Sequence, residues 1–175
     1  MVAAKGSGGS AAAGDPPDAY YYADGQRVLL QADPHHAAYD LQDSRQQRAQ
    51  AAGGRMLNAH VWLVALNTDD TESSMPASPP AQRLPVFRSG AMLLVALPEV
   101  RIEDDDPAHL LAVQHWLAAD HQRAALLAHQ PGRMTLQAGP ALAHDGVTLA
   151  RLVVEVCGVR SASPRLLRVS PKGPD

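Results

Sequence analysis

The clearest alternation of apolar and polar positions lies in residues 97–171. This segment begins with an extended run over residues 97–103 and ends with another, centred on residues 166–169. Between them, apolar residues recur at helical spacing in two stretches and follow a hairpin pattern in a third. We therefore predict the element order β-α-β-β-α-β, the split βαβ order of ferredoxin-like α+β folds, with both helices covering one face of the sheet.

The first helix is predicted to follow the acidic run Asp104, Asp105 and Asp106, with Pro107 at its first position. Carboxylates before the first turn accept hydrogen bonds from free amides and interact favourably with the helix dipole, and proline is well placed there. We expect this helix to run to about His121. Its predicted buried side repeats at i, i+3 and i+7 and consists of Leu110, Val113 and Leu117.

A hairpin and a second helix are predicted to follow. Residues 124–129 and 133–138 flank Pro131 and Gly132, which favour a turn. Asp145 can then cap a helix that ends at Gly158. The expected buried stripe of this helix is Leu149, Leu152, Val153 and Val156.

The part of the chain before residue 84 resembles the later part in a shortened form. A hairpin pattern around Asp24 and Gly25 recurs around Ser89 and Gly90, and Gly-Arg-Met occurs at residues 54–56 and again at residues 132–134. These matches indicate an internal duplication in which each copy runs hairpin, strand, helix, strand, with a helix over residues 43–52 and a strand over residues 56–66. Chance similarity in a chain rich in alanine and leucine is the alternative.

The composition divides the chain into five parts. Gly, Ala and Ser dominate the first part, and acidic residues, Ser and Pro dominate the third. The expected parts are a disordered arm at 1–18, a shortened N-terminal α+β half at 19–67, a linker at 68–83, the ferredoxin-like unit at 84–171, and a tail at 172–175.

Composition excludes several classes of partner. The net charge is -3 and the sequence pI is about 6.2, so no overall attraction for nucleic acid or for an anionic membrane is expected. No run approaches the roughly 18 apolar residues of a membrane span, and residues 1–18 lack the core of a signal peptide. We therefore expect a soluble, cytoplasmic protein. The single cysteine, Cys157, rules out an internal disulfide and is expected to be a buried thiol.

The histidines do not predict a metal site. His109, His115 and His121 are six residues apart, which rotates each about 240° from the last on a helix, whereas helical metal pairs are spaced i, i+3 or i+4. His35 and His36 follow Asp33 in a loop without a third preorganised ligand. We interpret all of them as surface histidines.

The acidic residues are also explained without chemistry. Asp104, Asp105 and Asp106 lack the spacing of a calcium loop and are better explained as helix-capping residues. Glu99 and Glu103 are more simply solvated charges than an acid and base pair. The sequence therefore predicts no catalytic residue, no metal, no cofactor and no small-molecule substrate.

Five short stretches, at residues 20–25, 84–88, 149–156, 158–159 and 163–169, together resemble the N-terminal prodomains of bacterial subtilisin-like serine proteases. In that family, a β-α-β-β-α-β prodomain packs its sheet on the protease and lays its C-terminal segment into the substrate cleft. It acts there as an inhibitor and a folding chaperone. The resemblance implies the same mode of binding for this chain.

The chain departs from that family because it contains no Gly-x-Ser-x-Gly elbow and no Asp, His and Ser catalytic set, and stops at Asp175. We expect a stand-alone, non-enzymatic module that binds, and inhibits or chaperones, a subtilisin-like protease supplied in trans. An extended segment can pair its main chain with a cleft edge. The predicted cleft-binding residues are Arg165, Leu166, Leu167, Arg168, Val169, Ser170 and Pro171.

Two alternatives remain. Residues 166–169 are equally consistent with an ordinary edge strand followed by a frayed terminus. The chain as a whole is also consistent with a non-catalytic adaptor or scaffold that recruits other proteins through its N-terminal arm or its acidic linker.

Overall fold

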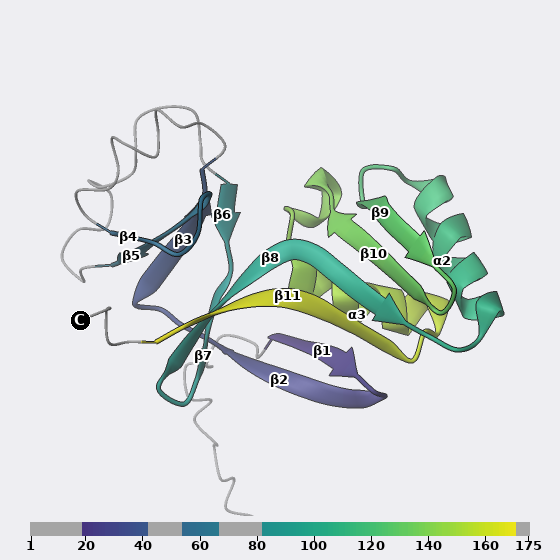
Figure 1. Cartoon of the computed structure of the whole chain (residues 1–175), viewed down its shortest axis with the longest axis horizontal. Coiled ribbons are helices and arrows are strands. Elements are labelled where there is room, and N and C mark those ends of the chain that lie inside the picture. Colours follow the sequence, from purple (N-terminus) through teal and green to yellow (C-terminus); the bar gives the residue numbers. More distant parts are fainter. Residues whose placement is uncertain (1–18, 42–53, 67–81, 171–175) are drawn as a thin grey trace, which may run out of the picture.

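The computed structural model describes residues 19–41, 54–66 and 82–170. Of these residues, 52% lie in strands and 22% in helices. Seven strands form one large antiparallel sheet (Figure 1). They are β1 (Ala19–Ala23), β2 (Gln26–Ala32), β7 (Val86–Ser89), β8 (Met92–Glu103), β9 (Ala124–Gln130), β10 (Arg133–Ala138) and β11 (Ser161–Val169).

Five of these strands close into a barrel. The sheet order is β11-β1-β2-β7-β8-β10-β9, and β11 pairs with β8 as well as with β1. One edge of β8 pairs with β11 along most of its length. Its other edge pairs with β7 over Met92 to Val95 and with β10 over Glu99 to Glu103. Pro98, which lacks a backbone N–H, lies between these two paired stretches, where no donor is needed.

Residues from all five barrel strands pack together in its interior. Leu30, Phe87, Leu94 and Ala96 are buried there, and Val147 from the helical side completes the cluster. The β1–β2 turn supports this arrangement because Asp24 and Gly25 both adopt positive φ, at 50° and 74°. Two such residues give the turn twist that matches a hairpin, as the Asp-Gly pair predicts.

A second antiparallel sheet packs against the barrel. Its order is β4-β5-β3-β6, with β3 (His36–Asp40), β4 (Arg55–Met56), β5 (Val61–Ala65) and β6 (Gln82–Leu84). Its apolar residues Ala38, Val61, Leu63 and Leu84 share one cluster with residues of the large sheet, namely Val86, Leu93, Val95, Leu97 and Val169. The two sheets therefore share a hydrophobic core.

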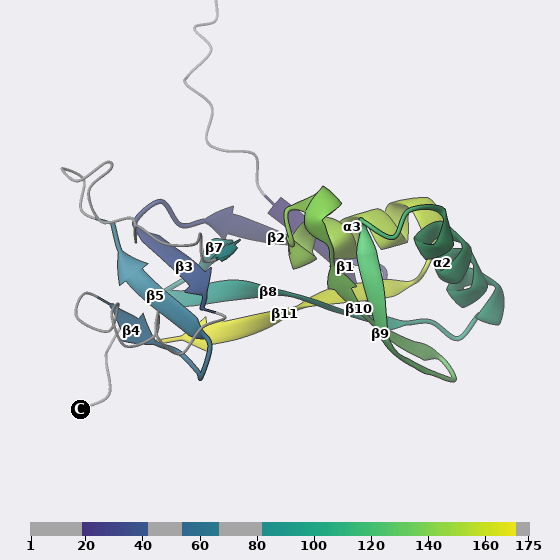
Figure 2. The same ribbon diagram turned by 90° about the horizontal axis from the view of Figure 1, so that it is seen from above.

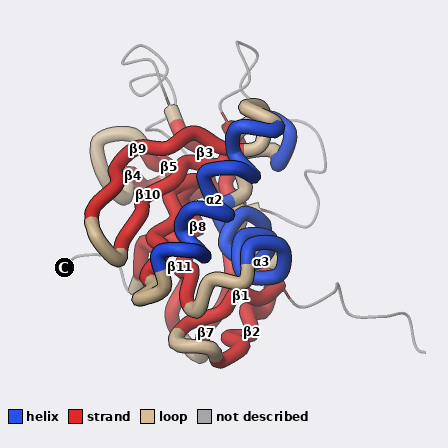
Figure 3. The backbone as a smooth tube through the Cα atoms, turned by 90° about the vertical axis from the view of Figure 1, so that its right-hand side faces the viewer, coloured by secondary structure: helices blue, strands red, loops and turns tan. Residues whose placement is uncertain are grey.

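The helices α2 (Pro107–Ala119) and α3 (Gly146–Cys157) lie next to each other on one side of β8 and β10, and the short helix η1 (Pro140–Leu142) precedes α3 (Figures 2 and 3). Their apolar residues join Val100, Ile102, Met134 and Leu136 of the sheet in one cluster. The predicted stripe of α2 is confirmed, since Leu110, Val113 and Leu117 are all buried. The prediction that both helices cover one face is also confirmed.

The predicted stripe of α3 is partly wrong. Leu149 and Val153 are buried, but Leu152 is half-buried and Val156 is 58% exposed. The buried side instead includes Gly146, Val147, Ala150 and Cys157. A Cβ on Gly146 would overlap the carbonyl oxygen of Leu97, so the helix begins in close contact with β8, and this contact sets the side that faces the sheet.

The predicted fold class is wrong. The order β-α-β-β-α-β is present, as β8-α2-β9-β10-α3-β11, but its strands do not form a separate ferredoxin-like α+β unit. The protein is mostly β, because β1, β2 and β7 bridge from β11 to β8 and close a five-stranded antiparallel barrel. Closure gives hydrogen-bond partners to strand edges that a four-stranded unit would leave open.

The predicted N-terminal half is divided between the two sheets. Its hairpin β1–β2 belongs to the barrel, whereas β3, β4 and β5 belong to the second sheet. The strand predicted over residues 56–66 is interrupted by a turn, in which Asn58 Oδ1 accepts hydrogen bonds from the backbone N–H groups of His60 and Val61 at 2.8 Å each. The predicted arm, the helix at 43–52, the tail and most of the linker lie outside the described residues.

Candidate protein-interaction surface

The side of the large sheet that faces away from the helices carries polar residues where β8, β10 and β11 meet. On β8, the even-numbered Val100 and Ile102 pack under the helices, so alternation places Glu99, Arg101 and Glu103 on the opposite side. The pairing of β8 with β10 and with β11 then adds residues from these two strands. We call this surface the open sheet face; it comprises Glu99, Arg101, Glu103, Arg133, Thr135, Gln137, Ser163 and Arg165.

The second sheet covers only the first half of this side. The side chains of Leu93, Val95 and Leu97 lie on the same side of β8 as those of the polar residues that follow. They are buried against β3, β5 and β6. Beyond Leu97 the side chains are polar and partly exposed. A recess of about 440 Å³ marks the border, with Asp40 and His60 on one wall and Glu99 and Arg165 on the other.

Ion pairs cross the open sheet face. Glu103 Oε1 accepts from Arg101 Nε at 3.0 Å and from Arg133 Nη2 at 3.2 Å, and Glu99 Oε2 accepts from Arg165 Nη1 at 2.9 Å. Three arginines against two glutamates leave the face with one positive charge. Exposed pairs of this kind contribute little to stability. Their more useful property is that long side chains are already held in place when a partner with complementary charge arrives.

The predicted cleft-binding segment is divided by the structure. Arg165 lies on the open sheet face, Leu166 packs on the barrel interior, and Leu167 packs on the core between the two sheets. Arg168 is exposed, whereas Val169 is only 3% exposed and pairs with Leu93. Residues up to Val169 are therefore built into strand β11.

Ser170 is the first exposed residue after this strand. Its carbonyl oxygen accepts a hydrogen bond from Arg55 Nη1 at 3.3 Å. Pro171, the last of the predicted cleft-binding residues, lies outside the described residues. If the segment enters a cleft, the part that can do so without dismantling the barrel begins at Ser170.

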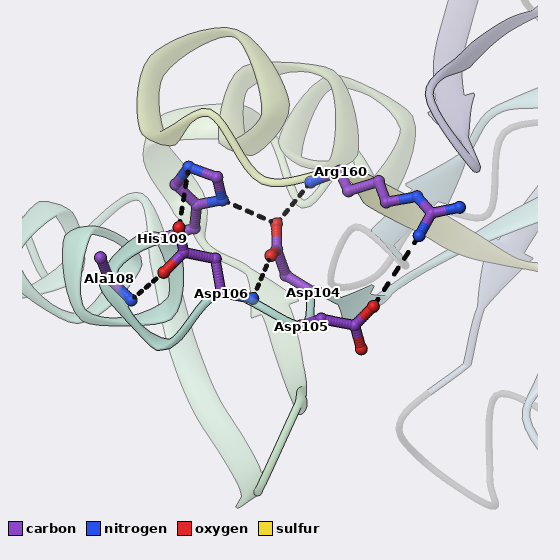
Figure 4. A network of polar contacts seen from close by, with 6 residues as sticks. All are labelled: Asp104, Asp105, Asp106, Ala108, His109 and Arg160. Atoms are coloured by element: carbon purple, nitrogen blue, oxygen red, sulfur yellow. Dashed lines mark hydrogen bonds and ion pairs between the residues drawn. The ribbon is translucent and has the colours of Figure 1, made fainter.

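A buried carboxylate anchors the far end of the open sheet face (Figure 4). The side chain of Asp104 accepts hydrogen bonds from the backbone N–H groups of Asp106 at 2.8 Å and Arg160 at 2.6 Å, and its Oδ2 lies 3.0 Å from His109 Nδ1. These contacts join the end of β8, the start of α2 and the loop between α3 and β11. Asp106 is the N-cap of α2, accepting from Ala108 N at 2.8 Å, which confirms the predicted capping role for Asp106 but not for Asp104 or Asp105.

The hydrogen bonds to Asp104 also determine its protonation. Burial by itself would raise the pKa of Asp104, but the amides of Asp106 and Arg160 and the ring of His109 stabilise the carboxylate more strongly. The pKa of Asp104 therefore lies below the usual value for aspartate. At neutral pH, this group is an anion that holds three elements together.

The other histidines do not gather around a metal. His115 and His121 are exposed, while His109 is held by Asp104. Within residues 19–41, 54–66 and 82–170, no group of three or more His, Cys, Asp or Glu side chains could hold a metal ion. Cys157 is buried, as expected, and burial raises the pKa of its thiol.

Comparison of the chain with protein-family models, with curated proteins and with solved structures gives no match in any of the three. The likeness to subtilase prodomains thus depends on the short stretches of sequence alone and stays a prediction. In the part of the chain that the structure describes, no helix is long and apolar enough to cross a membrane.

Glu99, Glu103 and Arg165 were each singled out from the sequence, but the sequence did not show that they lie on one face of a sheet. The signal was present as strict alternation in two runs, Val-Arg-Ile-Glu at residues 100–103 and Arg-Met-Thr-Leu-Gln-Ala at residues 133–138. Alternation alone shows that a strand has one polar side. It does not show that Glu103 lies opposite Arg133, because that register links residues that are distant in the sequence.

Proposed function

We propose that this chain is a non-enzymatic, prodomain-like module that binds a subtilisin-like serine protease supplied as a separate chain, and inhibits it or assists its folding. The open sheet face is the proposed docking surface. The segment that begins at Ser170 is the proposed cleft-binding part. The proposal combines the sequence resemblance with the surface described above.

One observation supports the proposal: strand β11 contributes Arg165 to the open sheet face and ends directly before Ser170. Arg165 is on the face, and Ser170 follows five residues later at the end of β11, roughly 16 Å along an extended chain. In the family that the sequence resembles, the sheet packs on the protease while the following segment enters the cleft. A single strand, β11, connects the two corresponding parts here.

The polar character of the face suits a partner that also exists free in solution. Interfaces between proteins that fold separately are about as polar as the rest of a protein surface. The arginines, Thr135 and Gln137 supply hydrogen-bond donors and acceptors, and the recess beside Asp40 and His60 offers a depression for a protruding side chain. Charge on such a face mainly governs the association rate and the choice of partner.

An inhibition assay tests this function. The purified chain is mixed with subtilases that have been separated from their own prodomains, and peptide hydrolysis is followed over time. We expect slower hydrolysis with the full chain. Deleting residues 170–175 should weaken the inhibition far more than deleting residues 1–18, while leaving β11 and its core residue Val169 in place.

The same assay separates this proposal from the adaptor alternative. An adaptor that recruits proteins through residues 1–18 or 68–83 would lose binding when those residues are deleted and would not slow hydrolysis. If the full chain neither binds any tested subtilase nor slows it, the prodomain-like function is wrong.

A further inference from the structure

A second concave site lies between the second sheet and the barrel, away from the open sheet face. This pocket has a volume of about 540 Å³, within the range of sites that hold small molecules. Its wall combines apolar and cationic side chains drawn from both sheets. The apolar residues are Leu63, Ala65, Leu93 and Val169, and the others that matter here are His36, Arg55 and Arg88.

A buried carboxylate holds two of these side chains in position. Asp33, whose side chain is 0% exposed, accepts through Oδ1 from Arg88 Nε at 3.1 Å and Arg88 Nη2 at 2.6 Å, and its Oδ2 lies 2.6 Å from His36 Nδ1. Burial would raise the pKa of Asp33, but the hydrogen bonds from Arg88 and His36 outweigh it and lower the pKa. Asp33 is therefore charged at neutral pH.

In the part of the chain that the structure describes, these contacts leave one further nitrogen on each of the two side chains without a partner. Within the described residues, Arg88 Nη1 and His36 Nε2 have no hydrogen-bond partner, and both side chains line the pocket. A buried acid that fixes the orientation of a guanidinium and an imidazole is the arrangement by which proteins preorganise groups for a ligand. The fixed orientation lowers the entropic cost of binding.

Arg55 brings a further positive charge from β4. Its Nη1 donates to the carbonyl oxygen of Ser170, and no carboxylate among residues 19–41, 54–66 and 82–170 forms an ion pair with it. Two arginines against one aspartate give the pocket an excess positive charge even when His36 is neutral. Complementarity therefore requires an anion, and the apolar wall requires that the anion carry a hydrocarbon part.

We propose that this pocket binds a small monocarboxylate with an aliphatic chain. The carboxylate lies between Arg55 and Arg88, where planar guanidinium groups can donate paired hydrogen bonds to its two oxygens. The aliphatic chain lies against Leu63, Leu93 and Val169. This binding site is separate from the protease-binding function proposed above and does not depend on it.

Titration with octanoate tests the site on the whole chain. Binding is followed by calorimetry and by backbone amide chemical shifts in NMR, with octylammonium as a probe of the same chain length and opposite charge. We expect octanoate to bind with a Kd below about 1 mM and to shift amides around Leu93 and Val169. Octylammonium should bind at least about tenfold more weakly.

Two substitutions act on different parts of the pocket. Arg55→Ala removes the unpaired charge, and Ala65→Trp fills the pocket; both positions are exposed, so neither change disturbs the core. Each should weaken octanoate binding by about tenfold or more. Arg160→Ala is the control, because Arg160 is an exposed arginine outside this pocket, and it should leave binding unchanged.

The proposal fails if octanoate does not bind at millimolar concentration or if octylammonium binds equally well. It also fails if binding survives both pocket substitutions, since the ligand would then lie elsewhere. Thermal unfolding of each variant, followed by circular dichroism, distinguishes a lost site from a lost fold. None of these results depends on whether a protease partner is found.

Discussion

At the scale of single residues, the two buried aspartates have the clearest roles. Asp33 ties the end of β2 to β7 and to the start of β3, and Asp104 ties the end of β8 to α2 and to the loop before β11. Neither could be recognised as buried from sequence, where each stands beside other polar residues in a loop-like run. Aspartate is almost never fully buried unless it is paired, and both are paired.

Replacing Asp104 tests this role. Asp104→Ala removes the carboxylate that accepts from the backbone N–H groups of Asp106 and Arg160 and should lower the free energy of unfolding by about 1–3 kcal/mol. The measurement is urea unfolding followed by circular dichroism. Asp105→Ala is the matched control, because the Asp105 side chain is fully exposed and its ion pair with Arg160 is long, at 3.8 Å. The control should leave the stability unchanged within the error of the measurement.

The pH dependence of the Asp104 effect follows from its lowered pKa. A carboxyl group with a lower pKa in the folded state stabilises the protein at pH values above its unfolded-state pKa of about 3.9. That contribution is lost as the pH falls through the folded-state pKa. The stability difference between the native chain and Asp104→Ala should therefore be constant near pH 7 and shrink below about pH 4. A difference that grows on acidification would contradict the assignment.

At the scale of elements, periodicity predicted both helices and the buried side of α2, but only part of the buried side of α3. The two capping aspartates, Asp106 and Asp145, occupy the N-cap positions of α2 and α3, and Gly158 ends α3 in the left-handed conformation. These are local features that the sequence encodes within a few residues. The face that α3 buries depends on the contact of Gly146 with Leu97, which lies on a distant strand.

The orientation of α3 can be tested with one substitution at two positions. Val153→Ala removes methyl groups from the core and should lower the free energy of unfolding by about 1.5–3 kcal/mol. Val156→Ala, three residues later on the exposed side, should cost less than about 0.5 kcal/mol. Chemical denaturation of both variants gives the comparison. Equal losses would mean that the predicted stripe, and not the observed one, is buried.

At the scale of the whole molecule, the barrel could not be predicted. Each of its hairpins has a local signal, such as Asp24 and Gly25, but closure depends on the pairing of Tyr22 with Ala162 and of Val169 with Leu93. These pairs join residues far apart in the sequence, and their register has no local signature. The same limit applies to the open sheet face, which requires β10 to lie between β8 and β9.

The barrel and the second sheet make residues 19–41 necessary for the rest of the fold. The hairpin β1–β2 contributes Leu30 to the cluster that covers Leu94 and Ala96, and Ala38 of β3 packs with Val95. A fragment of residues 82–175 would expose this apolar surface. We expect it to bind a hydrophobic dye and to unfold without a cooperative transition, whereas the full chain unfolds cooperatively. A fragment that unfolds as cooperatively as the full chain would contradict a shared core.

Charge reversal on the open sheet face tests the central claim most directly. The test protein is a double variant that combines Arg101→Glu with Arg133→Glu. Its fold should persist because both side chains are about half exposed. Affinity for a catalytically inactive subtilase with an empty cleft and without its prodomain is measured by surface plasmon resonance. The control is Arg27→Glu, which reverses an exposed charge on β2, outside the face. We predict that the double variant binds at least about tenfold more weakly than the native chain and the control. Equal binding by all three proteins would contradict docking through the open sheet face.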